Sequence, residues 1–316
     1  MAAAGEAGRA ILIAGPTASG KSALAAMLAE RLGGVVVNAD AMQVYRDLSI
    51  LTARPTAEEE ARVPHRLYGH VPAAEAYSVA RWLGDVAAVL VDCAAAGRPA
   101  IVVGGTGLYF EGLTRGLSAV PEVPDAVRER WRARAARLGP AGLHALLAER
   151  DPAMAARLRT TDPQRLLRAL EVVDATGRSL ADWHAEPPPP PLLPAAAIAG
   201  RLVLAPDRAW LHGRIAARFA QMLEAGGRAE AAAFAALGLD PALPASRAIG
   251  VAPLAALARG DIDEAAALNR AVVDTRRYAK RQETWFRNRM GDWPRLDPRN
   301  IRQAGEAFLK ELTGPT

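Results

Sequence analysis

Residues 15–22 read Gly-Pro-Thr-Ala-Ser-Gly-Lys-Ser, which fits the phosphate-loop pattern G-x-x-x-x-G-K-[ST]. In this pattern flexible glycines let backbone N–H groups converge on an anion, and the lysine adds a positive charge. A short apolar run at 10–14 precedes the loop, and a helix-forming segment at 22–32 follows it. This succession of strand, loop and helix predicts a site for a di- or triphosphate, with the Ser22 hydroxyl available to Mg²⁺.

The composition is that of a globular protein with a large core. The chain has 316 residues, of which 51% are hydrophobic and 23% charged, enough for one large domain or two ordinary ones. No apolar stretch is long enough to span a bilayer, and the segment 1–9 lacks the apolar core of a secretory signal. The single cysteine, Cys93, excludes an internal disulfide and suits a reducing compartment. We therefore expect a cytoplasmic protein, and no feature indicates a membrane or an obligate protein partner.

The chain is basic, with a formal net charge of +5. A basic surface favours an anionic partner such as a nucleic acid. Arginine supplies nearly all of this charge, however, and alanine is abundant, which is also typical of a coding bias. The net charge leaves both interpretations open, so the positions of the basic residues must decide between them.

Apolar runs that alternate with helix-forming segments predict an α/β fold. Besides 10–14, strand-like runs lie at 35–37, 99–103 and 202–204, and a helix-rich stretch covers 78–96. Each run is continuously apolar, as expected for parallel strands that are covered on both faces. The pattern predicts a phosphate-loop core in which a parallel sheet lies between two layers of helices.

The middle of the chain has a different character. Between 116 and 176 there are no strand-like runs, and segments such as 124–138 and 164–176 are helix-forming. Five consecutive prolines at 187–191 predict an exposed, extended spacer, and the chain after Asp207 is expected to be helical to near its end. We therefore expect a core interrupted by an all-helical insertion domain, with the division 1–115, 116–200 and 201–316.

Two polar side chains follow strands next to the phosphate loop. Asp40 comes shortly after the run at 35–37, and Thr106 lies in the glycine-rich turn after 99–103. Ligands of doubly wound sheets bind beyond the carboxyl ends of the strands, so both side chains are candidates for the site. The Asp40 carboxylate has three interpretations, namely a ligand of Mg²⁺, a proton acceptor, or the N-cap of a helix. No aspartate ends the run at 99–103, which argues against an ordinary kinase or ATPase.

Two groups of basic residues are candidates for binding phosphate. Arg208 and Arg214 lie at the start of a helix after 202–204, and a guanidinium can bind two phosphate oxygens at once. The second group lies at 274–289, where one helical face carries Arg276, Arg277, Lys280, Arg281, Thr284, Arg287 and Asn288. Such a stripe favours contact with a nucleic-acid backbone over a merely solvated face.

A series of motifs, in family order over 11–289, resembles the tRNA dimethylallyltransferase family. The matching stretches are 15–22, 38–45, 64–67, 75–78, 103–109, 162–166, 276–282 and 284–287. A series of this length covers nearly the whole chain and is far more specific than the phosphate loop alone.

The resemblance implies prenyl transfer to RNA. A dimethylallyl group would pass from dimethylallyl diphosphate to the exocyclic N6 amine of the adenosine immediately 3′ of the anticodon, without nucleotide hydrolysis. Lys21, Arg208 and Arg214 would neutralise the leaving diphosphate, Asp40 would accept the proton of the amine, and Thr106 would lie beside the same base. The diphosphate would bind, with Mg²⁺ on Ser22, to the loop of Gly15, Pro16, Thr17, Ala18, Ser19, Gly20, Lys21 and Ser22.

The resemblance also implies contacts with the anticodon stem-loop of tRNA. They would come from the loop after the second strand, from the helical insertion and from the basic helix. The implied residues are Asp40, Ala41, Met42, Gln43, Thr106, Arg128, Gln164, Arg165, Leu166, Leu167, Arg168, Arg276, Arg277, Lys280 and Arg281. The chain departs from the family pattern after 247–250, where a tyrosine and polar residues are usual but Val251-Ala252-Pro253 follow.

Two other functions are compatible with a phosphate loop. One is a small-molecule or nucleoside kinase that acts on ATP, and the other is an RNA-binding module without catalysis. The missing strand-end aspartate and the basic helix argue against the kinase. The convergence of Asp40 and Thr106 on one crevice argues against a module that only binds.

Overall fold

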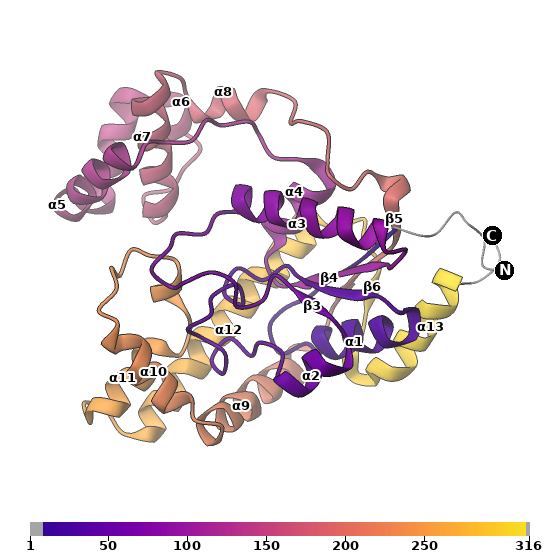
Figure 1. The fold of residues 1–316 in the computed structure, drawn as a ribbon. Helices are drawn as coiled ribbons and strands as arrows, with labels where there is room; N and C mark the ends of the chain where they lie inside the picture. Colours follow the sequence, from indigo (N-terminus) through magenta and orange to yellow (C-terminus); the bar gives the residue numbers. More distant parts are fainter. Residues whose placement is uncertain (1–8, 314–316) are drawn as a thin grey trace. The chain divides into compact units, whose positions relative to one another are not determined.

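The computed structural model describes residues 9–313 of the chain (Figure 1). The segments 1–8 and 314–316, which include most of the N-terminal segment considered above and the ends of two expected domains, lie outside the described residues. The described part of the chain divides into two compact units. One comprises 9–114 with 192–313, and the other comprises 115–191.

The first unit is built on a parallel sheet with the strand order β3-β2-β4-β1-β5-β6. Its strands are β1 (Ala10–Ala14), β2 (Val35–Asn38), β3 (His65–Arg66), β4 (Ala100–Gly104), β5 (Ile198–Leu204) and β6 (Arg295–Leu296). The four apolar runs of the sequence form the four central strands. The edge strands β3 and β6 were not predicted because each has only two residues and is largely polar. The expectation of unbroken helix after Asp207 is therefore wrong at β6.

Helices cover both faces of this sheet. Along β1, Leu12 packs into one apolar cluster, whereas Ile11 and Ile13 pack into another on the opposite face. Helices α3, α4, α10, α11 and α12 contribute to the first cluster, and α1 and α13 to the second. The helices of this unit are α1 (Lys21–Leu32), α2 (Ala57–Arg62), α3 (Val79–Ala95), α4 (Gly107–Arg115), α9 (Arg208–Glu224), α10 (Gly227–Ala236), α11 (Val251–Arg259), α12 (Glu264–Arg289) and α13 (Ile301–Thr313). The predicted three-layer α/β core is confirmed.

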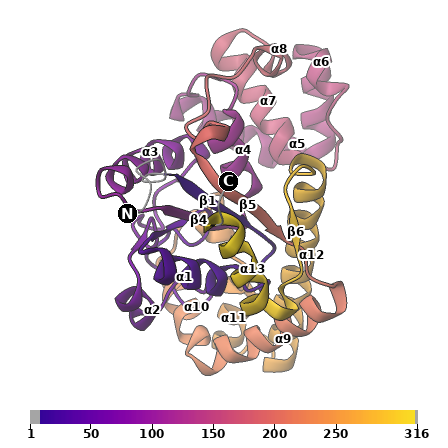
Figure 2. The same cartoon turned by 90° about the vertical axis from the view of Figure 1, so that its right-hand side faces the viewer.

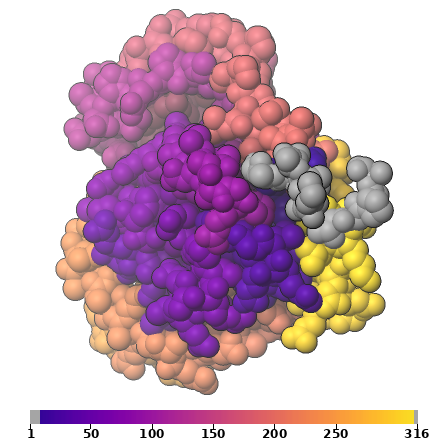
Figure 3. Space-filling model, turned by 45° about the vertical axis from the view of Figure 1, so that its right-hand side comes forward, coloured from indigo at the N-terminus to yellow at the C-terminus, as the bar shows by residue number. Residues whose placement is uncertain are grey.

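The last described helix completes the layer that carries the helix of the phosphate loop. Helix α13 lies beside α1, as the neighbouring yellow and indigo segments show in Figures 2 and 3. A Cβ on Gly305 of α13 would lie 2.2 Å from the Met27 side chain and 2.7 Å from that of Leu24. Glycine at 305 therefore allows the two helices to approach closely.

The second unit is helical and has a core of its own. Its helices are α5 (Asp125–Arg150), α6 (Pro152–Ala155), α7 (Pro163–Thr176) and α8 (Leu180–Ala185). Helix α5 bends at Gly139, which has φ 64° and precedes Pro140. Trp131, Leu147 and Leu166 pack together in its core. None of the helices in residues 9–313 combines the length and the apolar composition needed to cross a membrane.

Candidate active site

The strand order brings three loops together at one edge of the sheet. Strands β2, β4 and β1 are neighbours, and their carboxyl ends lead into the Asp40 loop, the Thr106 turn and the phosphate loop. The Gly15 N–H donates to the Gly104 carbonyl at 3.3 Å, and the Thr106 N–H donates to the Ala39 carbonyl at 3.2 Å. A Cβ on Gly104 would lie 2.0 Å from the Ala39 oxygen, so this approach requires glycine. The three loops therefore form one connected rim.

The phosphate loop has a conformation suited to an anion. Ala18, with φ 64°, and Gly20, with φ 90°, both adopt the left-handed backbone region. Gly20 is the N-cap of α1 and supplies no side-chain cap, so the N–H groups of the first turn remain for a ligand. Lys21 is buried at this helix start, and Ser22 is exposed beside it. The loop can thus hold a phosphate with its backbone and Lys21, while Ser22 can reach a metal ion bound to that phosphate.

Two arginines of α9 contact the phosphate loop. Arg214 Nε donates to the Ala18 carbonyl at 3.1 Å, and Arg218 Nη1 donates to Thr17 Oγ1 at 3.2 Å. Arg208, by contrast, is exposed in the first turn of α9. Arg218 was not among the expected site residues, although its spacing of four from Arg214 places both on one face of the helix.

The charges of the site act on one another. Burial lowers the pKa of Lys21 to about 8, with the Asp40 carboxylate opposing this change and Arg218 adding to it. Burial also lowers the pKa of Arg218, and Asp40 again opposes the change. Asp40 therefore lies close enough to the cationic groups around the phosphate loop to interact with them electrostatically. An anionic ligand at the loop would compensate the same buried positive charge.

Asp40 is held in a rigid loop. It is 9% exposed, its N–H donates to Asn38 Oδ1 at 2.8 Å, and its Oδ1 accepts the Met42 N–H at 3.0 Å. Trp82 Nε1 in turn donates to the Asn38 carbonyl at 2.8 Å. The next helix along the described chain, α2, begins only at Ala57, so the interpretation of Asp40 as a helix N-cap is wrong. The carboxylate is oriented by Oδ1, which leaves Oδ2 to accept a proton.

Hydroxyl groups lie next to this carboxylate. Thr106 Oγ1 accepts the Ala41 N–H at 3.0 Å, which ties the turn after β4 to the Asp40 loop. The Tyr278 phenol of α12 lies beside Thr106 and Gln282, which act to lower its pKa. Burial and the charge of Asp40 raise the pKa of Tyr278, so its phenol is neutral at physiological pH. The site therefore combines a carboxylate with neutral hydroxyl groups.

The remaining residues of the Asp40 loop serve its structure. Gln43 Nε2 donates to the carbonyls of Thr52 at 2.9 Å and of Ala53 at 2.8 Å, so only its Oε1 remains for another partner. Ala41 and Met42 are half-buried beside it. Gln43 thus anchors the loop to the segment at 52–53, in addition to any contact with RNA.

The basic stripe of α12 is divided between an exposed and a buried side. Arg277, Lys280 and Arg281 are exposed, as expected for a surface that meets RNA. Arg276 is half-buried, and its Nε has no hydrogen-bond partner among residues 9–313. Gln282 lies on the opposite, buried side with 5% exposure. The helix therefore presents cations outward and a neutral amide toward the phosphate loop.

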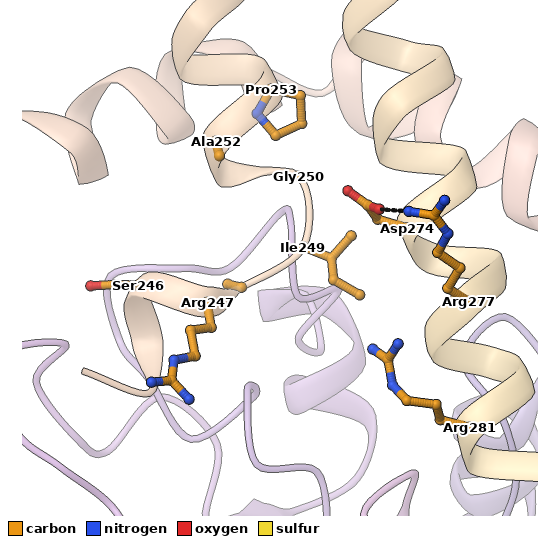
Figure 4. Close-up of a pocket in the computed structure, with 10 residues that line it drawn as sticks. Ser246, Arg247, Ile249, Gly250, Ala252, Pro253, Asp274, Arg277 and Arg281 are labelled. Atoms are coloured by element: carbon orange, nitrogen blue, oxygen red, sulfur yellow. Dashed lines mark hydrogen bonds and ion pairs between the residues drawn. The ribbon is translucent and has the colours of Figure 1, made fainter. Parts of the chain in front are cut away.

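A pocket adjoins this stripe. Its volume is about 390 Å³, and it lies between α12 and the segment that precedes α11. Arg247 lines it together with Arg277 and Arg281, which project from α12 in Figure 4. Arg277 Nη1 pairs with Asp274 Oδ1 at 3.3 Å. Val251, where this chain departs from the family pattern, is 6% exposed and packs in the core, so an apolar residue is accommodated there.

The expected RNA contacts of the second unit differ in accessibility. Gln164 and Arg165 are exposed on α7, but Leu166 is fully buried in the core of the unit. The Leu166 side chain packs among the helices, so the contact of Leu166 with RNA stays a prediction that its side chain does not support. Leu167 is partly buried against the same core.

Two further arginines of this unit lie near one another. Arg128 of α5 has ion pairs with Glu122 at 3.8 Å and Asp125 at 3.6 Å. Burial and the charge of Arg128 lower the pKa of Arg168 on α7, while the Glu171 carboxylate opposes the change. Helices α5 and α7 therefore bring Arg128 and Arg168 into one charged cluster.

The fold and this rim define a class of protein. The parallel sheet lies between two layers of helices, with a phosphate loop after β1 and a carboxylate after the nearby β2. These features characterise a phosphate-loop α/β protein that binds a phosphorylated ligand. The carboxylate beside the loop adds the capacity for proton transfer.

Comparison with known proteins identifies the family. The IPP transferase family matches residues 43–289, and the isopentenyl transferase family matches residues 8–70. The tRNA dimethylallyltransferase of Nitrobacter hamburgensis is 57% identical over 296 residues, which cover 93% of this chain and 92% of the relative. That of a Bradyrhizobium species is 56% identical over 306 residues, covering 96% and 97%. The chain therefore belongs to the IPP transferase family.

Solved structures agree with this assignment. The full-length tRNA isopentenylpyrophosphate transferase of Bacillus halodurans has a TM-score of 0.66 and 30% identity, with 96% of each chain covered. A eukaryotic dimethylallyltransferase acting on tRNA has a TM-score of 0.75 and 25% identity, covering 95% of this chain and 77% of that one. The predicted family resemblance is confirmed, and the alternative of a phosphate-loop kinase is not favoured.

Proposed function

We propose that the chain transfers a dimethylallyl group from dimethylallyl diphosphate to the N6 amine of the adenosine 3′ of the anticodon in tRNA. The observation that carries this proposal is the connection of the Asp40 loop to the Thr106 turn beside the phosphate loop. The Ala41 N–H, next to Asp40, donates to Thr106 Oγ1 at 3.0 Å. The names of these two relatives support the reaction type. The neighbouring positions of β2, β4 and β1 in the sheet support the proposal, because the loops that follow these strands start at one edge of the sheet.

The phosphate loop holds the diphosphate of the donor. Its backbone N–H groups and Lys21 bind the phosphates, and Arg214 and Arg218 add positive charge from α9. Arg208, exposed in the first turn of the same helix, adds a further positive charge. The C1–O bond breaks with its electron pair going to the diphosphate, and these cations stabilise the negative charge that develops there.

The donor set fits a magnesium ion on Ser22. Among residues 9–313 no group of three or more His, Cys, Asp or Glu side chains is placed to hold a metal. Mg²⁺, however, commonly needs only one or two protein ligands when phosphate oxygens and water complete its shell. The Ser22 hydroxyl, exposed at the start of α1, supplies such a ligand. The ion would neutralise part of the charge on the leaving diphosphate.

Asp40 acts on the acceptor. The lone pair of N6 forms the new bond to C1, and the amine loses a proton to Asp40 Oδ2. Thr106 lies beside the same base, and the hydrogen bond between its hydroxyl and the Ala41 N–H keeps the two loops in register. The adenine must leave the base stack to reach this rim, as in other enzymes that modify a base.

Each unit of the chain contributes residues that bind tRNA. Exposed cations of α12, with Arg247 at the adjoining pocket, bind phosphates of the anticodon stem-loop. Gln164, Arg165, Arg128 and Arg168 contribute from the helical unit. The target base meets a further group of residues where it enters the site, namely Asp40, Ala41, Met42, Gln43 and Thr106.

Release of diphosphate tests the reaction. We expect the protein to release diphosphate from dimethylallyl diphosphate only when unmodified tRNA is present, since the amine of the adenosine is the acceptor. A tRNA with guanosine at the target position is the matched control and should give no release. Release of phosphate from ATP, with no dependence on the prenyl donor, would instead favour a kinase.

A further inference from the structure

We infer that Gln282 is a positioning residue that fixes the phosphate loop and the Thr106 turn relative to each other, an inference that rests on the proposed function. Gln282 lies on the buried side of α12 and is 5% exposed. Its Oε1 accepts the Thr17 N–H at 2.9 Å, and its Nε2 donates to the Gly105 carbonyl at 2.9 Å. A single side-chain amide thus joins the donor's loop to the turn beside the acceptor.

Each end of this bridge lies in a loop of the site. Thr17 is the third residue of the phosphate loop, and its hydroxyl is bound by Arg218. Gly105 immediately precedes Thr106 in the turn after β4. Strands β1 and β4 are adjacent, so the bridge spans neighbouring loops rather than distant ones. Both loops are therefore anchored to the same side chain of α12.

The fit around Gln282 is close. A Cβ on Gly105 would lie 2.1 Å from Gln282 Nε2 and 3.4 Å from Asp40 Oδ2. Tyr278, one turn earlier on α12, lies beside both Thr106 and Gln282. The same helix side consequently contacts the donor's loop and the Thr106 hydroxyl, and the carboxylate lies within a few ångströms of the bridge.

The chemistry of the bridge calls for an amide. Thr17 N–H needs an acceptor and the Gly105 carbonyl needs a donor, and a glutamine side chain offers one of each at its end. An ionised glutamate at 282 would accept from Thr17 but would place an oxygen against the Gly105 carbonyl. Methionine has a similar length but makes neither bond. Loss of a buried partner leaves a polar group unsatisfied, which is unfavourable.

The role of the bridge is alignment. Gln282 satisfies its two bonds within the protein, so it does not itself accept the proton or bind the leaving group. Group transfer requires the reacting atoms to lie about 3–3.5 Å apart in line, and a displacement of about 1 Å can lower the rate by about 10². Loosening the two loops should therefore lower kcat much more than it weakens the binding of either substrate.

The test compares Gln282→Glu, Gln282→Met and Gln282→Ala with the wild-type protein, with Gln221→Glu on the exposed side of α9 as the matched control. Prenyl transfer to tRNA is measured for kcat and for the KM of each substrate, and thermal unfolding identifies the variants that fold. We expect kcat of the folded Gln282 variants to fall about tenfold or more at pH 8, with each KM changed less than threefold. The control should keep its kcat.

The pH dependence of kcat in Gln282→Glu distinguishes a hydrogen-bonding role of Gln282 from a role in packing alone, because packing would not change with pH in this range. When its carboxyl group is protonated, the side chain again offers one acceptor and one donor, so its kcat relative to wild type should recover as the pH falls from 8 to 5.5. Equal kcat in the wild-type protein and every folded variant, or a Glu/wild-type ratio that does not change with pH, would overturn the inference. Failure of the wild-type protein to transfer the prenyl group would contradict the proposed function instead, so the two failures are distinguishable.

Discussion

Binding of the donor's diphosphate is expected to be coupled to the protonation of Lys21. Burial lowers the pKa of this ammonium group to about 8 in the free protein. A bound diphosphate places negative charge beside it, which favours the charged form and raises the pKa of Lys21. Above pH 8 the protein must therefore take up a proton when the diphosphate binds.

The pKa sets the size of this effect. At pH 8 about half of the Lys21 side chains are neutral, so binding should take up about half a proton. Well above pH 8 the affinity should fall almost tenfold per pH unit, or about 1.4 kcal/mol, because only the charged form holds the phosphate. At pH 9 the dissociation constant should be about ten times its value at pH 7, provided that no other group of the site titrates in this range.

Calorimetry tests this coupling. The binding of inorganic diphosphate is measured at pH 7, 8 and 9 in buffers with different ionisation enthalpies, which gives the number of protons taken up. Lys21→Met should bind more weakly and show no such uptake, while Lys310→Met, on the exposed surface of α13, should behave as wild type. A constant affinity with no proton uptake between pH 7 and 9 would refute the reasoning.

The same pKa has a consequence for stability. The pKa of Lys21 in the folded protein lies below its ordinary value of 10.5, so between pH 8 and 10.5 the unfolded chain binds more protons than the folded one. The buried charge therefore destabilises the free protein fully below pH 8, and this penalty is relieved as the pH rises toward 10.5. Diphosphate offsets the penalty by supplying a counter-charge.

The remaining predictions concern the acceptor, the RNA surface and the helical unit. Asp40→Asn should lower kcat by about 10² or more with little change in tRNA affinity, and an unaltered rate would remove Asp40 from the proton-accepting role. Arg281→Ala should reduce the slope of log affinity against log salt by about one, as expected for one lost phosphate contact. Arg302→Ala on α13 is the control for Arg281→Ala. Equal salt slopes for the two variants would show that the face of α12 with Arg281 is solvated and does not contact RNA phosphates. Leu166→Ala should destabilise the helical unit by about 2–5 kcal/mol. The unfolding of this unit is measured through the fluorescence of Trp131 in the same core, and an unchanged unfolding midpoint would contradict the burial of Leu166.

Periodicity and composition were sufficient to predict the core of the fold. Strands β1, β2 and β4 and the last three residues of β5, Leu202–Leu204, are buried on both faces, so each is recorded in the sequence as an apolar run. The edge strands β3 and β6 do not appear as apolar runs in the sequence. Each pairs with only one neighbouring strand, and two residues, at least one of them polar, are enough to form that pairing. The phosphate loop was predicted from its glycines and its lysine, whereas the left-handed conformation of Ala18 was not.

The side of a helix that faces the site was harder to predict. The sequence at 274–289 is dominated by charge, which indicated a solvated or RNA-binding face, and Gln282 is inconspicuous among these cations. Its burial results from the docking of α12 on two loops far away in the sequence, and no local pattern encodes that contact. Leu166 shows the converse, because it lies next to exposed polar residues in a motif yet packs inside its unit.

The central claim is tested most directly by mapping the product on tRNA. The protein is incubated with dimethylallyl diphosphate labelled at C1 and an unmodified tRNA with adenosine 3′ of its anticodon, and the RNA is digested and analysed by mass spectrometry. We predict one labelled N6-dimethylallyladenosine, located 3′ of the anticodon, from the wild-type protein and almost none from Asp40→Asn. Label at another atom or position, or no label with a folded protein that binds both substrates, would contradict the account.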